Sequence, residues 1–230
     1  MIYVIGNKVR LSSKGMWNEG NSYEKENIYS ISENKFPPVN YDLHKIKPHS
    51  LTHSESGKHT SNQGKTLDLL IESNPEYFYG TCAVLKFQND YKQIGENLYI
   101  KEITEEEISG KISDVCGDTI PPKILISTTD YPTDENGYHA ENHILVLSEG
   151  AADYLCSLTD FHLFGTSWKS TDYQPGKMQR PIHTKIFSRG VVFELLNLKE
   201  VPEGKYIFSG MPLYLEDSSE SPVTPILVSI

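Results

Sequence analysis

The sequence contains little cysteine and no long apolar run. Its three cysteines, Cys82, Cys116 and Cys156, are odd in number and widely spaced, so they form neither a disulfide framework nor a CxxC pair. The longest apolar runs, such as KILIS at 123–127, are far too short to span a bilayer. The first residues lack the basic, apolar and small-residue regions of a signal peptide. We therefore expect a cytoplasmic protein that does not enter a membrane.

Basic residues are also few. Lys and Arg number 21 against 31 Asp and Glu, so the formal net charge is −10 at pH 7. An acidic surface repels phosphate backbones, and we therefore expect no nucleic-acid partner. The chain has no GxSxG elbow and neither of the common glycine-rich phosphate loops, which leaves a serine hydrolase of that class and the phosphate-loop folds unsupported.

The remaining pattern mixes many strands with a few helices. One helix is predicted at 64–73. A second is predicted to begin at the capping box formed by Thr104 and Glu107, and a third to begin after Ser148, which can cap it. Because no linker divides the chain, we predict one α/β domain over residues 1–230 with a mixed sheet and few helices. Strands are predicted at 2–6, 81–87, 123–127, 143–148, 162–167, 190–196, 205–215 and 225–230.

Residues 15–38 differ from the rest of the chain. They are polar and aromatic, with turn residues throughout, which predicts an irregular lid or arm. Trp17, in this segment, is either a lid aromatic or a packing residue, and we favour the packing interpretation.

The most informative stretch is HSLTHSESGKH at 49–59, which supplies His49, His53, Glu55 and His59. Imidazole and carboxylate groups are ligands of zinc, manganese and ferrous iron. The preceding proline and Gly57 disfavour a helix here. All four residues are odd-numbered, so in an extended segment they would point to the same side. The alternative is a polar surface loop whose histidines have no function.

A metal site built on this stretch needs further ligands from elsewhere in the chain. Glu194 is notable because it interrupts the apolar run GVVFELL, and a buried carboxylate must be paired, hydrogen-bonded or metal-bound. The alternative is a strand edge with Glu194 facing solvent. The other candidates are His139, His143, His162 and His183.

These residues resemble the motif of the cyclase family, which includes bacterial kynurenine formamidase and isatin hydrolase. The family motif is HxGTHxDxPxH, and this chain has His49, Thr52, His53 and His59 at the corresponding places. The C-terminal third is similar too. The segments SEGAADYLCSL, HLFGTS and PIHTKIFSRGVVFELL follow in the family's order, and then an EVPEG-like turn and SPV precede the last strand. The resemblance runs from about residue 40 to the end.

The resemblance implies a swivelling β/β/α fold and a centre of one or two divalent ions, Zn or Mn. It implies His49, His53, Glu55, His183 and Glu194 as the metal ligands. His59 corresponds to the family's catalytic acid/base. The chain departs from the family where Glu55 replaces Asp and where Leu51 and Gly57 replace the motif Gly and Pro. The spacing from Gly190 to Glu194 is also one residue shorter, and such a change reverses side-chain facing unless a bulge absorbs it.

The resulting hypothesis is a metal-dependent hydrolase that uses a metal-activated water. Its substrate would be either an arylformamide-like amide or a cyclic amide or lactone. The alternative hypothesis is a divergent cyclase-fold protein that binds a metal or small molecule without hydrolysis. The expected partners are a small-molecule substrate and further copies of the chain, as a dimer or tetramer.

Overall fold

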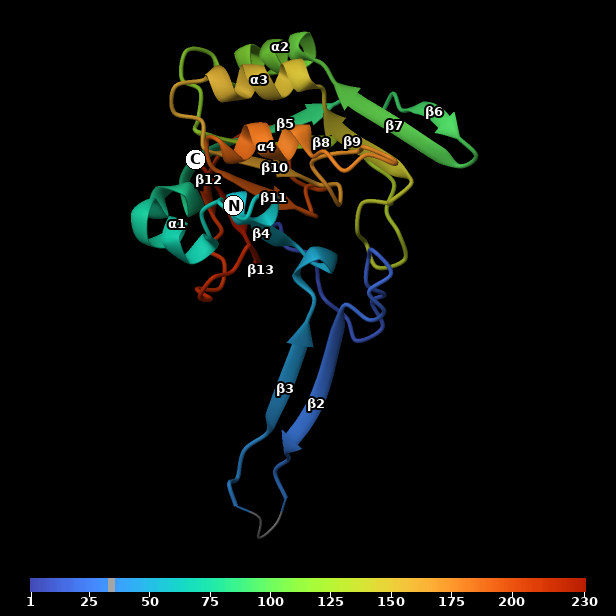
Figure 1. The fold of residues 1–230 in the computed structure, drawn as a ribbon, viewed down its shortest axis with the longest axis vertical. Coiled ribbons are helices and arrows are strands. Elements are labelled where there is room, and N and C mark those ends of the chain that lie inside the picture. The colour runs from blue at the N-terminus through green and yellow to red at the C-terminus, as the bar shows by residue number, and fades with distance from the viewer. Residues whose placement is uncertain (33–35) are drawn as a thin grey trace.

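A nine-stranded mixed sheet forms the centre of the molecule (Figure 1), in a computed structural model that describes residues 1–32 and 36–230. Its strand order is β1-β14-β12-β5-β8-β10-β11-β4-β13. The neighbours from β5 to β11 run parallel, and the strands on either side of them pair antiparallel. The remaining strands form two smaller sheets, β2-β3 and β6-β7-β9.

The bounds of the elements follow the chain. The strands are β1 (Ile2–Val4), β2 (Tyr23–Tyr29), β3 (Tyr41–Ile46), β4 (His53–Glu55), β5 (Tyr79–Phe87), β6 (Lys92–Gly95), β7 (Leu98–Ile103), β8 (Lys123–Thr128), β9 (His143–Leu147), β10 (Leu163–Thr166), β11 (Val191–Glu194), β12 (Gly204–Ser209), β13 (Glu220–Pro222) and β14 (Ile226–Ser229). The helices are α1 (Leu67–Ser73), α2 (Glu105–Cys116), α3 (Glu149–Ser157) and α4 (Pro181–Phe187), with short 3-10 turns η1 (Pro48–Ser50), η2 (Gly57–His59) and η3 (Pro75–Phe78).

Both faces of the central sheet are buried. Helices α2, α3 and α4 cover one face, while α1 lies against the other (Figure 1). Alternate residues of β5 divide between the two cores: Ala83 and Leu85 belong to the first, and Cys82 and Val84 to the second. Burial on both faces explains why the central strands are continuous apolar runs in the sequence.

The predicted α/β class with a mixed sheet and few helices is confirmed. The capping box of Thr104 and Glu107 opens α2, and the Ser148 hydroxyl accepts from Ala151 N–H at the start of α3. Helix α4 was not predicted. The longest helix among the described residues, α2, has twelve residues, and none of these helices is both long and apolar enough to cross a membrane.

The prediction of irregular structure over 15–38 is wrong for β2, which pairs with β3 as an antiparallel ribbon projecting from the body (Figure 1). Because the ribbon is exposed, its strands lack the apolar alternation of a half-buried strand, and the sequence pattern missed them. Residues 33–35 of the predicted segment lie outside the described residues. The predicted strand over 205–215 is also too long, because β12 ends at Ser209, before Gly210 and Pro212.

Candidate functional site

Two neighbouring strands supply the centre of the site. In the antiparallel pair of β4 and β11, Glu194 lies directly opposite His53. Residues opposite each other share a face of the sheet, and so do residues two apart on one strand. His53, Glu55 and Glu194 therefore project to the same side, and all three are buried. The shorter spacing from Gly190 does not turn Glu194 away from the site, and the alternative of a solvent-facing Glu194 is wrong.

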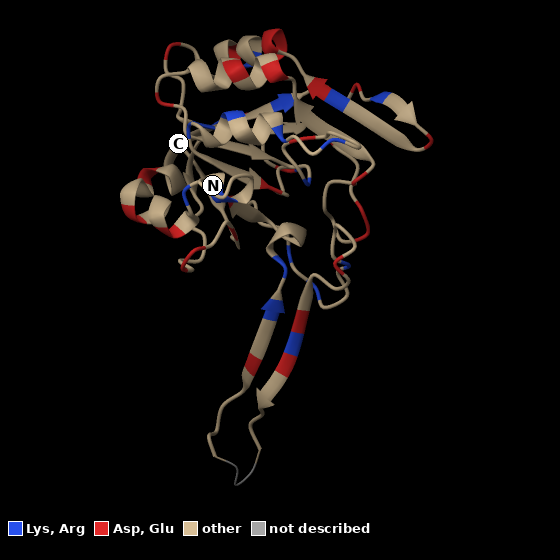
Figure 2. Cartoon of the chain, in the orientation of Figure 1, with Lys and Arg blue, Asp and Glu red and all other residues tan. Residues whose placement is uncertain are grey.

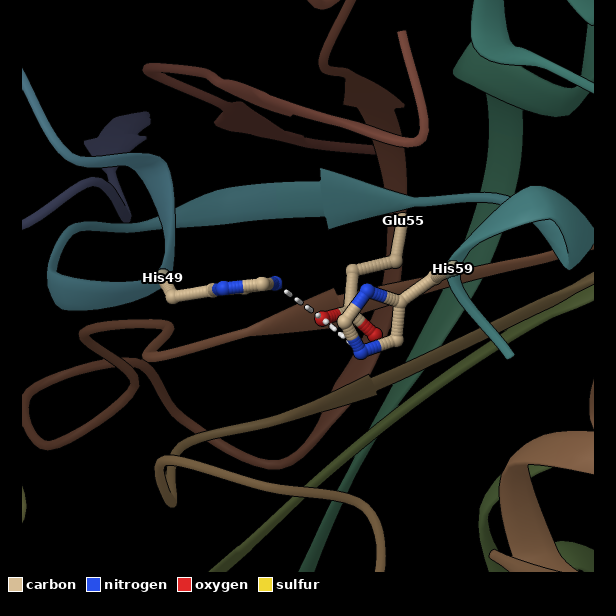
Figure 3. Close-up of side chains that lie close together, drawn as sticks. All are labelled: His49, Glu55 and His59. Atoms are coloured by element: carbon tan, nitrogen blue, oxygen red, sulfur yellow. Dashed lines mark ion pairs between the residues drawn. The ribbon is translucent and has the colours of Figure 1, made fainter. Parts of the chain in front are cut away.

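The two other motif histidines flank β4 on 3-10 turns. His49 lies on η1, which Pro48 opens, and His59 lies on η2. Their Nε2 atoms approach Glu55 Oε1 from either side, at 3.3 Å for His49 and 3.4 Å for His59 (Figure 3). The predicted extended segment is therefore confined to β4, yet the four motif side chains still converge.

His183 reaches the same centre from α4. Its Nε2 atom lies 3.2 Å from both Glu55 Oε2 and Glu194 Oε1. Its Nδ1 atom donates to Asp172 Oδ2 at 2.7 Å, and the backbone N–H groups of Ile182 and His183 also donate to that carboxylate. Asp172 therefore ties the first turn of α4 and the imidazole into one arrangement that points Nε2 at the carboxylates.

His53 is oriented in a similar way. Its Nδ1–H donates to the Leu51 carbonyl at 2.8 Å, which leaves Nε2 facing Glu55 Oε1 at 3.1 Å. Glu194 Oε1 accepts from the backbone N–H of Thr171. A second hydrogen bond that fixes ring orientation is typical of a metal-ligating histidine.

The electrostatics of the cluster reflect its burial. Burial raises the pKa of Glu55, but the close imidazoles of His183, His49 and His53 prevail and hold that pKa well below its usual value. Burial lowers the pKa of His183, but Asp172, Glu194 and Glu55 raise it well above the ordinary value. Burial also lowers the pKa of His53, but the hydrogen bond to Glu55 and the charge of that carboxylate raise it above the ordinary value. The buried carboxylates thus attract positive charge, which protons or a cation can supply.

The residues fit a divalent metal. Glu55 Oε2 and His49 Nε2 are buried yet have no hydrogen-bond partner among the described residues, although nitrogen and oxygen atoms surround them. Two groups of three possible ligands share Glu55: His49, Glu55 and His59, and His53, Glu55 and Glu194. Imidazole nitrogen and carboxylate oxygen suit zinc, manganese or ferrous iron.

The cluster opens into a cavity of about 170 Å³ whose lining includes Trp17, Glu19, Ser170 and Arg180. Trp17 and Arg180 also line a neighbouring cavity of about 560 Å³, which contains Trp168 and Tyr173. A volume of that size is typical of small-molecule sites. The site therefore combines a polar centre with an adjoining, partly aromatic cavity.

The loop that carries Trp17 is fixed to the segment that carries His49. Ser50, next to His49, accepts from Met16 N–H at 2.7 Å and donates to Glu19 Oε2 at 2.8 Å. Trp17 itself has a φ of 60°, in the left-handed region that bulky residues rarely adopt. Trp17 is 49% exposed and lines both cavities, which favours the lid interpretation over the packing interpretation.

Three histidine candidates lie outside the site. His139 contacts Tyr91 and Ser167 in a buried network, and His143 stacks on Tyr99. His162 contacts Lys123 and stacks on Tyr77. Of the residues predicted to complete the motif, the structure thus brings together His183 and Glu194. Asp172, Glu19, Arg180 and Glu220 were missed, because their distant positions in the sequence form no local pattern with the motif.

Comparison with known proteins places this geometry in a known fold. The sequence matches no protein-family model and no curated protein. Among solved structures, isatin hydrolase A from Ralstonia solanacearum is 18% identical, with a TM-score of 0.75 over 100% of this chain and 92% of that chain. A predicted metal-dependent hydrolase from Bacillus stearothermophilus is 19% identical, with a TM-score of 0.70 over 99% and 97% of the two chains. A protein described as a novel cyclase is 11% identical, with a TM-score of 0.72 over 100% and 88%.

This chain has the cyclase-like fold. The likeness covers almost the whole of each chain, so the predicted fold is confirmed beyond the motif region. In this example of the cyclase-like fold, the His and Glu cluster lies beside β4 and β11, where the motif and the C-terminal third meet.

Proposed function

We propose that this protein is a metal-dependent hydrolase that cleaves either an arylformamide-like amide bond or the ring bond of a cyclic amide or lactone. The observation that carries the proposal is the group of His49, His53, Glu55, His183 and Glu194. Their ligand atoms converge, and His49 Nε2 and Glu55 Oε2 have no hydrogen-bond partner among the described residues. The similar structures described as isatin hydrolase and as a metal-dependent hydrolase support the same reaction class.

Each residue has a role in this proposal. The five converging side chains would hold one or two divalent ions, Zn or Mn. A divalent ion held there supplies a Lewis acid that polarises the scissile carbonyl and acidifies a water. His59 is the acid/base. It takes a proton from the attacking water as the oxygen bonds to the carbonyl carbon, and it returns that proton to the nitrogen as the C–N bond breaks. With an amide substrate the products are an amine and a carboxylic acid, and the acid then releases its proton to become a carboxylate.

The larger cavity beside the His and Glu cluster would bind the substrate. Trp17 lines both cavities, and Lys169 Nζ lies over its ring, 4.2 Å from the ring centre. Trp168 and Tyr173 line the larger cavity but not the smaller one. Aromatic walls bind planar groups by stacking, which favours a substrate with an aryl ring beside the scissile amide.

A metal-reconstituted assay tests this function. Purified protein would be loaded with Zn or Mn and assayed on N-formylkynurenine, isatin and a simple lactone. We expect metal-dependent turnover of at least one of these compounds, and its loss on chelation. The absence of turnover with every metal, although metal is bound, would contradict hydrolysis.

One observation favours the alternative of a non-catalytic binder. Glu55, longer by one methylene than the family's Asp, places Oε1 within 3.1 to 3.4 Å of the Nε2 atoms of three histidines. His59 is one of them, so Glu55 occupies the approach to the proposed acid/base. Stoichiometric metal binding without hydrolysis of formamides, imides or lactones would favour this alternative.

We further propose that the protein is a homo-oligomer whose contact is the arm formed by β2, β3 and the described residues between them, 30–32 and 36–40. Acidic and basic residues alternate along the ribbon (Figure 2), and they pair within it, as between Lys25 and Asp42 at 2.8 Å. Beyond them the arm exposes large apolar side chains, including Ile31 at 62% and Phe36 at 92%. A two-stranded ribbon is marginal alone in water, so a second copy that covers these side chains would stabilise it.

The body of the same chain offers a matching surface. Met211, Leu213, Tyr214 and Leu215 are exposed in a row, and Met211 and Leu213 line a cavity of about 250 Å³. Because one chain carries both the apolar arm and this apolar surface, two copies can exchange arms and form two identical contacts. Exchange of this kind closes a dimer.

A further inference from the structure

Glu220 lies on the face of the sheet that carries the candidate metal ligands. Strand β13 pairs with β4, and Glu220 is directly opposite Glu55. Directly opposite residues share a face, so the Glu220 carboxylate projects to the same side as Glu55 and Glu194. Glu220 is the one of these three carboxylates that the converging ligand group does not use.

The imidazole of His59 lies between two of these carboxylates. Its Nδ1 atom is 3.8 Å from Glu220 Oε2, and its Nε2 atom is 3.4 Å from Glu55 Oε1. The His59 and Glu220 side chains are each 24% exposed, so bulk water only partly screens the pair. Glu220 therefore faces the nitrogen of His59 that points away from the metal-ligand group.

Local hydrogen bonds hold Glu220 in this position. The Ser219 hydroxyl donates to Glu220 Oε2, and the Ser218 hydroxyl donates to the Glu220 carbonyl at 3.1 Å. The backbone N–H of Ser56, next to Glu55, donates to the Ser219 carbonyl at 2.9 Å. The strand that carries Glu220 is thereby tied to the motif strand. The neighbouring His59 imidazole lowers the pKa of Glu220 to about 2, so the carboxylate is ionised at neutral pH.

We propose that Glu220 is a positioning residue that holds His59 with Nδ1–H directed toward the Glu220 carboxylate and Nε2 directed toward the reacting atoms. The role of His59 as acid/base rests on the proposed function, but its orientation by Glu220 does not. A carboxylate beside Nδ1 fixes the tautomer that leaves Nε2 free to accept a proton. It also stabilises the imidazolium that forms when the proton is taken, as the aspartate of a Ser-His-Asp triad does.

The test compares Glu220→Gln with the wild type and with Glu216→Gln. Glu216→Gln removes one exposed charge from the same loop and is the matched control. Each zinc-loaded protein is measured three ways: metal content, the tautomer of His59 from its ring-nitrogen NMR shifts, and kcat and KM on the substrate that the assay identifies. Glu220→Asp, which keeps the charge, tests rescue.

We expect Glu220→Gln to keep its zinc and to move the neutral His59 ring away from the Nδ1–H tautomer. Its kcat should fall roughly 10- to 100-fold with KM changed less than about twofold, a loss at the lower end of that for removing a general base. Glu220→Asp should recover part of the kcat, and Glu216→Gln should match the wild type.

Unchanged His59 ring shifts in Glu220→Gln would overturn the proposal, as would loss of zinc. If the His59 tautomer changes in Glu220→Gln but the wild type turns over no substrate, the positioning role is supported and the proposed hydrolysis is contradicted. The failure of this proposal can therefore be told apart from the failure of the proposed function.

Discussion

Asp172 accepts a 2.7 Å hydrogen bond from His183 Nδ1, and both residues are buried. The bond leaves His183 Nε2 as the atom that faces Glu55 and Glu194. The same carboxylate accepts from two backbone N–H groups at the start of α4, so the position of the helix and the direction of the imidazole depend on one residue. Asp172 would therefore affect the metal centre without being a ligand.

Asp172→Asn should weaken metal binding. Asparagine keeps the shape but removes the charge that favours the His183 Nδ1–H tautomer, and loss of such a partner typically costs roughly 10- to 100-fold in metal affinity. Competition with a chelator of known affinity measures the change. Asp153→Asn, at an exposed position on α3, is the control and should bind metal as the wild type does. Equal affinities for both variants would show that His183 does not bind the metal through Nε2.

His59→Ala should abolish turnover and keep the metal. His59 is the acid/base in the proposed reaction, and removing such a group typically reduces the rate roughly 100- to 10,000-fold. Elemental analysis and the hydrolysis assay are made on the same preparation, with His44→Ala on the arm as the control. If the variant loses its metal instead, His59 is a ligand, as its place beside His49 and Glu55 also allows.

Acidification should destabilise the fold through His139, which lies away from the candidate metal site. Burial, and then the nearby His143, lower the pKa of His139 to about 3. The unfolded chain therefore binds a proton that the folded chain excludes between about pH 6.5 and pH 3, and stability falls as the pH falls through this range. For this one group the loss from pH 7 to pH 5 is roughly 2 kcal/mol.

Urea unfolding at both pH values, for the wild type and His139→Gln, measures this contribution. The variant lacks the titrating imidazole, so its free energy of unfolding should depend less on pH. His162, whose pKa burial and Lys123 lower to about 4, acts in the same direction and remains in both proteins. An identical pH dependence in the two proteins would contradict the assignment to His139.

Charges placed where the paired strands of the arm end should break the oligomer. Tyr29 and Tyr41 stack across the ribbon with ring centres 6.1 Å apart, and both are about half exposed. Tyr29→Lys together with Tyr41→Lys would place two cations where a second copy must bury apolar surface. Light scattering should show the wild type as a dimer and this variant as a monomer. Leu11→Lys, at an exposed apolar residue off the arm, should remain dimeric; a monomeric wild type would contradict the arm's role.

The sequence predicted the parts of this molecule that depend on local pattern. The apolar runs of β5, β8 and β11 are long enough to be recognised, and the caps of α2 and α3 are short-range motifs. His49, His53, Glu55 and His59 lie within one stretch, so their convergence follows from a short strand between two turns. Glu194 was recognised because a carboxylate in an apolar strand needs a partner.

The parts that were missed depend on tertiary contacts. Asp172 and Glu220 meet the motif only after α4 and β13 dock beside β4, and nothing near them in sequence indicates a site. His139 and His162 resemble ligand candidates in sequence, but aromatic stacking and neighbouring polar groups satisfy them elsewhere. The strands of the arm were missed because they are stabilised by pairing with each other and bury little against the body. The cytoplasmic location stays a prediction.

The metal content of the purified protein, compared between the wild type and Glu55→Gln, tests the central claim most directly. Glu55 contributes to both groups of possible ligands, so its carboxylate charge is required whichever group binds. Elemental analysis should find one or two equivalents of Zn, Mn or Fe in the wild type, and little in Glu55→Gln after the same purification. A wild type that carries no such metal, and takes none up when it is supplied, would contradict the account.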